Sequence, residues 1–367
     1  MRLRILISNI LFDERKDYQE VICAREFARM GCEVLAVTPL HTPGVEPPPW
    51  RVAKVEKYLR VRDTIFFPRG LRKIVEDFKP EVAFLHAPNH GLSCAVMRHL
   101  PTGCKVVPVF GDLRESHHGR RGKWLTVRGN PIFKRLVKDR WYRHLMRRAD
   151  LILAVTNETV RLLREVEAEA VDARGFMCGL AADPTVFFND PSVRAPGARR
   201  KTLVTVTRIF PEKPVLEWVQ PVLRFLQKHP DWNYVLAGLL PGGARTQQEL
   251  LAAAPPGQLE VRPLLSAQEM NTVFNRADLA VWYLPAISIQ QSMITGLPVL
   301  LPFNESLNHL VREGVNGFYY RSPEQLEVQL ERAAAQSWDR GAVASENAGL
   351  ASPGVFGGIL ERLKLQV

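Results

Sequence analysis

The stretch that says most about the fold is Leu203-Val204-Thr205-Val206-Thr207-Arg208-Ile209-Phe210-Pro211-Glu212-Lys213-Pro214. Its apolar half predicts a buried strand, and its prolines predict a turn that leads into a helix from about Val215. Open α/β sheets bind ligands where the carboxyl end of a strand meets the amino end of a helix, and that helix end favours anions. Arg208 and Lys213 therefore suit a diphosphate. The alternative is two solvated surface cations beside Glu212 and Glu217.

Length and pattern together predict two domains. At 367 residues the chain exceeds one ordinary domain. Strand-like apolar runs alternate with helical patterns throughout, which is typical of parallel sheets covered by helices on both faces. A polar, proline-containing stretch at residues 189–201 looks like a linker. We therefore expect an α/β protein with two Rossmann-like, doubly wound domains at 1–190 and 201–340, and a last helix within 355–367 that packs back on the first domain.

The alternating pattern also places individual elements. The expected strands are Arg4–Ser8, Glu33–Thr38, Val82–His86, Lys105–Phe110 and Leu151–Val155 in the first half, and Leu203–Thr207, Trp232–Ala237, Leu259–Arg262, Leu279–Tyr283, Val299–Pro302 and Gly317–Tyr320 in the second. The helices expected in the second half are Val215–Lys228, Thr246–Ala253, Ala267–Asn275, Ile289–Thr295, Leu307–Glu313 and Pro323–Ala335. Residues 342–352 are poor in large apolar side chains and are expected to form a loop before a final helix at 355–365.

The net charge of +11 is carried by the first half of the chain. Residues 201–367 contain 14 Lys and Arg against 15 Asp and Glu, whereas residues 1–200 contain 35 against 23. The excess is densest at 114–148, where 12 basic residues are interleaved with aromatic and aliphatic ones. From Pro131 the apolar residues recur at helical spacing, which favours an amphipathic helix on an anionic membrane. One alternative is a solvated helix whose apolar side packs on its own domain. Nucleic acid is less well supported, because no zinc spacing or RNP-like motif accompanies the charge.

Cysteine spacing and the start of the sequence bear on localisation. The five cysteines show no CxxC spacing, and an odd, scattered set predicts reduced cytoplasmic thiols. Residues 1–8 form too short an apolar stretch for a signal peptide and are followed by the charged residues 13–17, so a first strand is expected. No apolar run reaches the roughly 18–20 residues of a membrane-spanning helix. We expect a cytoplasmic protein, peripheral to the inner face of the membrane.

The order of motifs in the second half resembles the glycosyltransferases of the two-Rossmann-domain (GT-B) type, family four in particular. The segments that carry the resemblance are Val206–Lys213, Asn233–Gly238, Ala277–Val281, Met293–Val299 and Asn316–Phe318. They correspond in turn to a strand–Arg–turn–Lys signature, a strand with its glycine, an Ala-Asp step before a strand, a Met-x-x-Gly-x-Pro-Val element and a closing Asn-Gly. The first half matches more loosely. This resemblance implies two Rossmann-like domains that face each other across a cleft.

The resemblance also implies a nucleotide-sugar donor held mainly by the second domain. Arg208 and Lys213 would contact its diphosphate, where fixed cations compensate the charge that grows as the anomeric bond breaks. The remaining donor contacts would come from Gly238, from the helix start at Ser288, Ile289 and Gln290, and from Gln291, which would bind the ribose. The sequence has no Asp-x-Asp pair to chelate a metal. In this architecture side chains and helix ends take that role, so no metal or other cofactor is expected.

The sequence departs from the family pattern in the donor site. Family members usually carry Glu-x7-Glu before Gly-x-Pro, and the matching positions are Tyr283 and Gln291. Gln291 can still hydrogen-bond to hydroxyls, although without charge assistance, whereas Tyr283 cannot replace an acceptor-only carboxylate. Tyr283 is therefore either part of a changed donor site or an aromatic side chain at the edge of the core.

The first half departs from the pattern as well. It lacks the family's glycine-rich loop after strand one, and the frequent histidine after strand four is replaced by Phe110-Gly111-Asp112. Asp112, His117 and His118 lie just past a predicted strand end, where a carboxylate or imidazole could orient or deprotonate an acceptor hydroxyl. His86 ends another strand and is a second candidate. A retaining enzyme could instead let the leaving phosphate take that proton.

We therefore expect a glycosyltransferase that moves a sugar from a nucleotide-diphosphate donor to a hydroxyl of a lipid-linked or polysaccharide acceptor, with retention as the resemblance implies. Two alternatives stay open. The first is a binding or scaffold protein that has lost transfer activity, which the missing glutamates motivate. The second is a nucleic-acid-directed glycosyltransferase that uses the same donor site.

Overall fold

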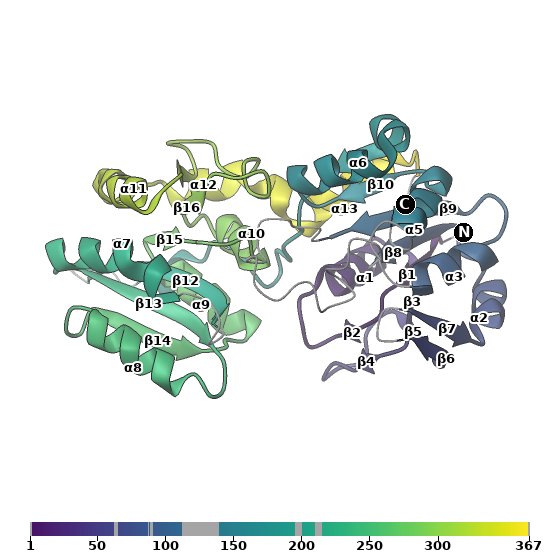
Figure 1. Cartoon of the computed structure of the whole chain (residues 1–367), viewed down its shortest axis with the longest axis horizontal. Helices are drawn as coiled ribbons and strands as arrows, with labels where there is room; N and C mark the ends of the chain where they lie inside the picture. The colour runs from purple at the N-terminus through teal and green to yellow at the C-terminus, as the bar shows by residue number, and fades with distance from the viewer. Residues whose placement is uncertain are drawn as a thin grey trace. The chain divides into compact units, whose positions relative to one another are not determined.

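The computed structural model describes residues 2–61, 65–86, 88, 91–111, 139–194, 200–209 and 215–365. The chain forms two compact units (Figure 1). The first unit comprises Met1–Ala181 and Ser352–Val367, and the second comprises Ala182–Ala351. The chain therefore leaves the first unit ahead of the polar stretch at 189–201. Asp190 belongs to the second unit, where its backbone N–H donates to Asn275 Oδ1 at 2.8 Å.

The first unit is built on a seven-stranded parallel sheet in the order β11-β10-β9-β8-β1-β3-β5. Its strands are β1 (Arg4–Ser8), β3 (Glu33–Thr38), β5 (Arg51–Lys54), β8 (Val82–His86), β9 (Lys105–Phe110), β10 (Ile152–Ala154) and β11 (Gly175–Met177). Its helices are α1 (Gln19–Arg29), α2 (Leu71–Phe78), α3 (Gly91–His99), α5 (Asp139–Arg148), α6 (Asn157–Arg174) and α13 (Ser352–Arg362). Two small pairs, β2 (Phe12–Asp13) with β4 (His41–Thr42) and β6 (Glu56–Val61) with β7 (Ile65–Arg69), complete it.

Helices cover both faces of this sheet, because alternate side chains of each strand point to opposite faces. On β8, Ala83 and Leu85 pack with α2 and α3 in one apolar cluster. The intervening Phe84 contacts Phe27 of α1, with ring centroids 4.9 Å apart. Phe27 in turn contacts Phe356 of α13 at 5.3 Å. The last helix of the chain is therefore part of the core of the first unit.

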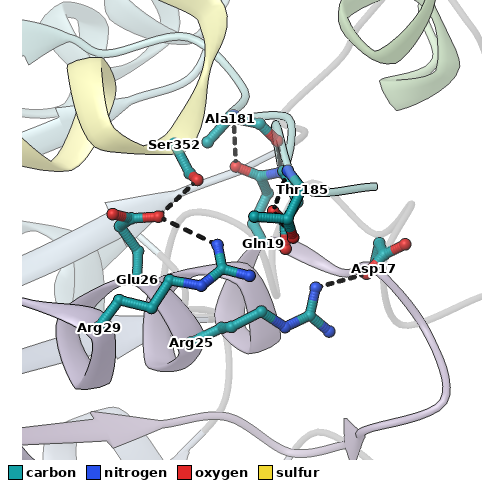
Figure 2. Close-up of polar contacts among 9 residues, drawn as sticks. Asp17, Gln19, Arg25, Glu26, Arg29, Ala181, Thr185 and Ser352 are labelled. Atoms are coloured by element: carbon teal, nitrogen blue, oxygen red, sulfur yellow. Dashed lines mark hydrogen bonds and ion pairs between the residues drawn. The ribbon is translucent and has the colours of Figure 1, made fainter. Parts of the chain in front are cut away.

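Polar contacts fix the same helix at its start (Figure 2). Ser352 Oγ donates to Glu26 Oε2 at 2.7 Å, and both side chains are buried. Arg29 lies 3.5 Å from the same carboxylate. On the preceding turns of α1, the Gln19 amide donates to the backbone oxygen of Ala181 and accepts from its N–H, both at 2.8 Å. Helix α1 thus holds the last residue before the second unit and the first residue after it.

The second unit contains a six-stranded parallel sheet in the order β14-β13-β12-β15-β16-β17. Its strands are β12 (Lys201–Ile209), β13 (Trp232–Leu239), β14 (Leu259–Pro263), β15 (Leu279–Val281), β16 (Val299–Pro302) and β17 (Gly317–Tyr320). Its helices are α7 (Val215–Lys228), α8 (Ala244–Ala253), α9 (Ala267–Arg276), α10 (Ile287–Ile294), α11 (Pro323–Ala335) and α12 (Arg340–Glu346), with short 3-10 turns at Pro191–Val193 and Ala348–Leu350.

The second sheet is covered on both faces, which explains why strands β15, β16 and β17 are short apolar runs, whereas the edge strand β14 carries charged residues. Leu203 and Leu279 pack with α7, α8 and α11 in one cluster. Their neighbours Val204 and Ala280 pack with α9 and α10 in another. The predicted α/β class with parallel sheets is confirmed.

The Ala277-Asp278 step has a counterpart in the first unit, Ala149-Asp150, and both have one physical cause. Asp278 Oδ2 accepts the backbone N–H of Thr202 at 2.7 Å, and Asp150 Oδ2 accepts that of Val106 at 2.9 Å. In each unit the carboxylate between a helix and the next strand therefore satisfies a backbone donor at the start of the neighbouring strand. Such donors would otherwise lack a partner at the sheet edge.

Two local predictions in the second unit are wrong. Residues 307–313 do not form a helix: 307–310 are in turns and Glu313 is in a β-bridge with Gly317. Side chains take the backbone donors that a helix would use, because Tyr319 Oη accepts from Val311 N and Asn316 Oδ1 accepts from Arg312 N. Residues 342–352 were expected to form a loop, but helix α12 (Arg340–Glu346) and the 3-10 turn at Ala348–Leu350 occupy most of this range. The Asp339 side chain caps this helix, and Val343 is its only buried residue.

None of the described helices combines the length and the apolar composition needed to cross a bilayer.

Candidate functional site

The carboxyl edge of the six-stranded sheet is where β12, β15 and the start of α10 meet. Arg208 is exposed on the penultimate residue of β12. Strand β15 pairs with β12, and the chain passes from β15 through residues 282–286 into α10. Lys213, the second predicted cation, lies outside the described residues. The described part of the predicted diphosphate site is therefore Arg208 and the amino end of α10.

Gly238 shapes the backbone beside Arg208. The pairing of β12 with β13 shifts register between Val206 and Ile209, so the strands bulge at Thr207 and Arg208. Gly238 has φ +118°, and a Cβ there would lie 1.9 Å from the carbonyl oxygen of Thr207. Only glycine fits this approach. The glycine that the resemblance assigned to the donor site thus has a backbone role next to the predicted cation.

Helix α10 is tied to β12 by a buried triangle of hydrogen bonds. Ser288 Oγ donates to the carbonyl oxygen of Val206 at 2.7 Å. Trp282 Nε1 lies 3.2 Å from Ser288 Oγ and 3.3 Å from the same carbonyl oxygen. Ser288 and Trp282 are both buried. The triangle brings the first turn of the helix to a point two residues before Arg208.

The other predicted residues of α10 differ in their roles. The N–H of Ile289 donates to the carbonyl oxygen of Ala286 at 3.1 Å, and its side chain lies in the core. Ile289 is therefore committed to the fold, and the N–H groups that helix geometry leaves without an intrahelical acceptor are those of Ile287 and Ser288. In the amide orientation that satisfies both of its polar atoms, the Gln290 nitrogen donates to the carbonyl oxygens of Ala286 and Ile287 at 3.2 and 3.3 Å.

Gln291 differs from its neighbours because its polar end is unsatisfied. The side chain is 3% exposed, and Oε1 has no hydrogen-bond partner among the described residues. Leaving a buried acceptor without a partner costs on the order of 1–3 kcal/mol. A ligand hydroxyl that donated to Gln291 Oε1 would remove this cost.

The hydroxyl of Tyr283 points into the protein interior. It lies 3.4 Å from Tyr234 Oη, which donates to Thr205 Oγ1 at 2.8 Å. Its ring stacks on Trp218 of α7, with centroids 6.2 Å apart. Burial raises the pKa of Tyr283 well above its usual range. The position that carries a glutamate in the family therefore holds an aromatic side chain whose polar atom is already engaged.

In the first unit, Asp112, His117 and His118 lie outside the described residues. His86, the other histidine candidate, ends β8 and is buried, with Nε2 unpartnered among the described residues. Burial lowers the pKa of His86 to about 4, so it is neutral at physiological pH. Sequence reasoning did not single out Glu20, in the first turn of α1. Burial, opposed by a hydrogen bond from Asn9, raises the pKa of Glu20 to about 7.

The described part of the basic segment is helix α5. Its apolar residues Tyr142, Leu145 and Met146 are buried in the core of the first unit. Arg143 and Arg147 both contact Glu167 of α6, at 3.2 and 3.1 Å. Over residues 139–148, then, the apolar side of the helix packs on its own domain, and an apolar face for membrane insertion is not available there.

Among the described residues, no three His, Cys, Asp or Glu side chains lie together in a way that could hold a metal ion.

Residues 23–175 match the family model described as glycosyl transferase 4-like domain. No curated protein matches the sequence. Solved structures match over nearly the whole chain. The Anabaena protein HepE, solved in complex with UDP and glucose, is 13% identical, with 99% of this chain and 100% of that one covered and a TM-score of 0.70.

Two further structures give the same picture. A sucrose-phosphate synthase from Thermosynechococcus elongatus is 12% identical, covers 99% of both chains and has a TM-score of 0.69. A glycosyltransferase from Rickettsia africae is 12% identical, with 99% of this chain and 98% of that one covered and a TM-score of 0.66. At such identities the likeness is one of fold, and it confirms the predicted GT-B architecture.

Proposed function

We propose that this protein is a glycosyltransferase that transfers a sugar from a nucleoside diphosphate donor to an acceptor hydroxyl. The match of residues 23–175 to a glycosyl transferase 4-like domain and the GT-B fold of the chain support this proposal. The observation that carries the proposal is the contact between Ser288 and Val206, which places the start of α10 beside the strand end that bears Arg208. A helix amino end next to a guanidinium is suited to a diphosphate.

The remainder of the donor has a candidate contact in Gln291. Its unsatisfied Oε1 can accept a hydrogen bond from a ribose hydroxyl. The HepE structures were solved with UDP and with UDP-glucose, so uridine diphosphate sugars are the first donors to test. Lys213 is proposed as the second cation of the site.

The acceptor is proposed to be a lipid-linked or polysaccharide hydroxyl, with Asp112, His117 and His118 as candidate contacts. The basic segment 114–148 would attract an anionic membrane surface on the cytoplasmic side. Because the apolar side of α5 is packed in the core, α5 would contribute to this attraction through its cations alone. Retention of anomeric configuration and independence of metal are further parts of the proposal. The anomeric signal of the product and activity in EDTA test them.

The central test is nucleotide binding by wild type and Arg208→Gln. We expect UDP to raise the thermal midpoint of the wild type, because a ligand that binds only the folded state stabilises it. Arg208→Gln should weaken UDP binding roughly tenfold or more, since a charge-assisted contact to phosphate is lost. Arg276→Gln is the matched control. Arg276 is another exposed arginine of the same unit, and it lies at the end of α9.

Two results would overturn the donor site. One is a wild type that responds to none of UDP, GDP and ADP. The other is an Arg208→Gln variant that binds UDP as tightly as Arg276→Gln does.

A specific observation also favours the second candidate, a binding protein without transfer activity. Tyr283 replaces a carboxylate, and its hydroxyl is turned toward Tyr234. If nucleotide binds but no nucleoside diphosphate is released from any common sugar nucleotide with glycan or lipid-linked acceptors, the binding protein is the better description.

A further inference from the structure

We propose that Ser288 and Trp282 are positioning residues of the nucleotide site, which hold the amino end of α10 in place through the carbonyl oxygen of Val206. The inference rests on the proposed function, because it assigns these side chains a role in placing helix N–H groups for a diphosphate. Neither side chain would touch the donor. Each acts through the backbone that it orients.

The Ser288 hydroxyl does not cap its own helix. A serine near the start of a helix commonly caps its own helix. Here the N-cap is Ala286, which provides no side-chain cap. The Ser288 hydroxyl instead reaches across to β12, at 2.7 Å from the carbonyl oxygen of Val206. The contact therefore fixes the position of the helix relative to the sheet.

The turn before α10 is held from the other side of the sheet as well. Tyr320 Oη donates to the carbonyl oxygen of Trp282 at 2.7 Å. The Tyr283 hydroxyl meets Tyr234. The residues on either side of the turn are thus tethered to β12, β13 and β17, so the helix start cannot shift without breaking buried hydrogen bonds.

Helix α10 is short and depends on its contacts with the sheet. With eight residues, α10 is too short to be stable by itself. Without the tether its first turn would fray or move, and each binding event would have to order it again. An anion site works best when its donors are fixed before the ligand arrives. Tethering the helix start to the strand that bears Arg208 keeps the two parts of the site in register.

The test compares two serine variants of the same helix. Ser288→Ala removes the contact with β12. The control, Ser292→Ala, removes a buried hydroxyl one turn later that donates to the carbonyl oxygen of Ile289 within the helix, at 2.8 Å. Both variants should lower the thermal midpoint. Only Ser288→Ala should raise the Kd for UDP measured by calorimetry, by roughly tenfold, the factor that corresponds to one lost hydrogen bond.

A second variant keeps the test decisive if Ser288→Ala does not fold. Trp282→Phe keeps an aromatic side chain and removes the pyrrole ring with its N–H, and we expect a threefold to tenfold rise in Kd. The inference is overturned if Ser288→Ala, or Trp282→Phe in its place, binds UDP as tightly as Ser292→Ala does while Arg208→Gln binds it poorly. A wild type that binds no nucleoside diphosphate would instead overturn the proposed function.

Discussion

Gly238→Ala tests whether the close approach of β13 to β12 shapes the nucleotide site. An alanine Cβ would lie 1.9 Å from the carbonyl oxygen of Thr207, so the backbone next to Arg208 would have to move by more than 1 Å. The alanine at position 238 would also have to adopt φ +118°, which L residues avoid.

The magnitude follows from these two terms. Positive φ costs an alanine about 1–2 kcal/mol, and forced displacement of a packed backbone adds about 1–3 kcal/mol. For a unit of this size, the sum corresponds to a fall in thermal midpoint of roughly 5–15 °C.

Gly257→Ala is the control, because Gly257 also has a positive φ (+71°) but has nothing within 4 Å of an added Cβ. It should therefore show the dihedral cost alone. Differential scanning fluorimetry of both variants, followed by UDP titration, gives the comparison. If Gly238→Ala lowers the midpoint no more than Gly257→Ala and leaves the Kd for UDP unchanged, the close approach has no such role.

Three further predictions concern the framework of the two units. Ser352→Ala should lower the free energy of unfolding by about 1.5–3 kcal/mol, the range for a hydrogen bond to a charged group. Amide hydrogen exchange in α1 and α13 should become faster. Unchanged protection would contradict the role of the contact with Glu26. Arg340→Met should destabilise the second unit by about 2–3 kcal/mol, because the Arg340 guanidinium donates to three backbone carbonyl oxygens at 2.7–3.2 Å. The exposed control Arg276→Met should change the free energy of unfolding by less than about 0.5 kcal/mol. Glu20 favours its neutral form in the folded state, so its contribution to stability is present below pH 4.5 and is lost as the pH rises to about 7. Across this pH range the thermal midpoint of Glu20→Gln should therefore rise relative to that of the wild type. Parallel curves of midpoint against pH would show that Glu20 titrates normally.

The fold could be read from the sequence where burial is complete. Strands such as Val299–Pro302 were placed correctly because both faces of the sheet are covered, so every residue is apolar or small. Prediction failed where side chains decide the backbone. Asn316 and Tyr319 come after the residues whose N–H groups they bind, and nothing in the local pattern at 307–313 reveals that they fold back. Helix α12 was not predicted for the opposite reason: Val343 is its only buried residue, so burial leaves almost no pattern in its sequence.

The candidate site shows the same division. Arg208 and Gln291 could be selected from order and spacing, because residue type and strand position are visible in sequence. The inward turn of the Tyr283 hydroxyl depends on Tyr234 and Thr205, which lie on two other strands. Likewise, Ser288 was selected for its backbone, and its side-chain contact with Val206 joins residues 82 positions apart.

The return of the chain to its first unit has a consequence for biosynthesis. Phe27 and Glu26 are made early, but their partners Phe356 and Ser352 follow the whole second unit, and Ser352 comes 326 positions after Glu26. While the ribosome is still adding the second unit, α1 presents the Phe27 ring without Phe356 and the Glu26 carboxyl without the Ser352 hydroxyl. The first unit therefore reaches its native packing only once the whole second unit has been synthesised, and a nascent chain halted near residue 350 would be a natural client for chaperones.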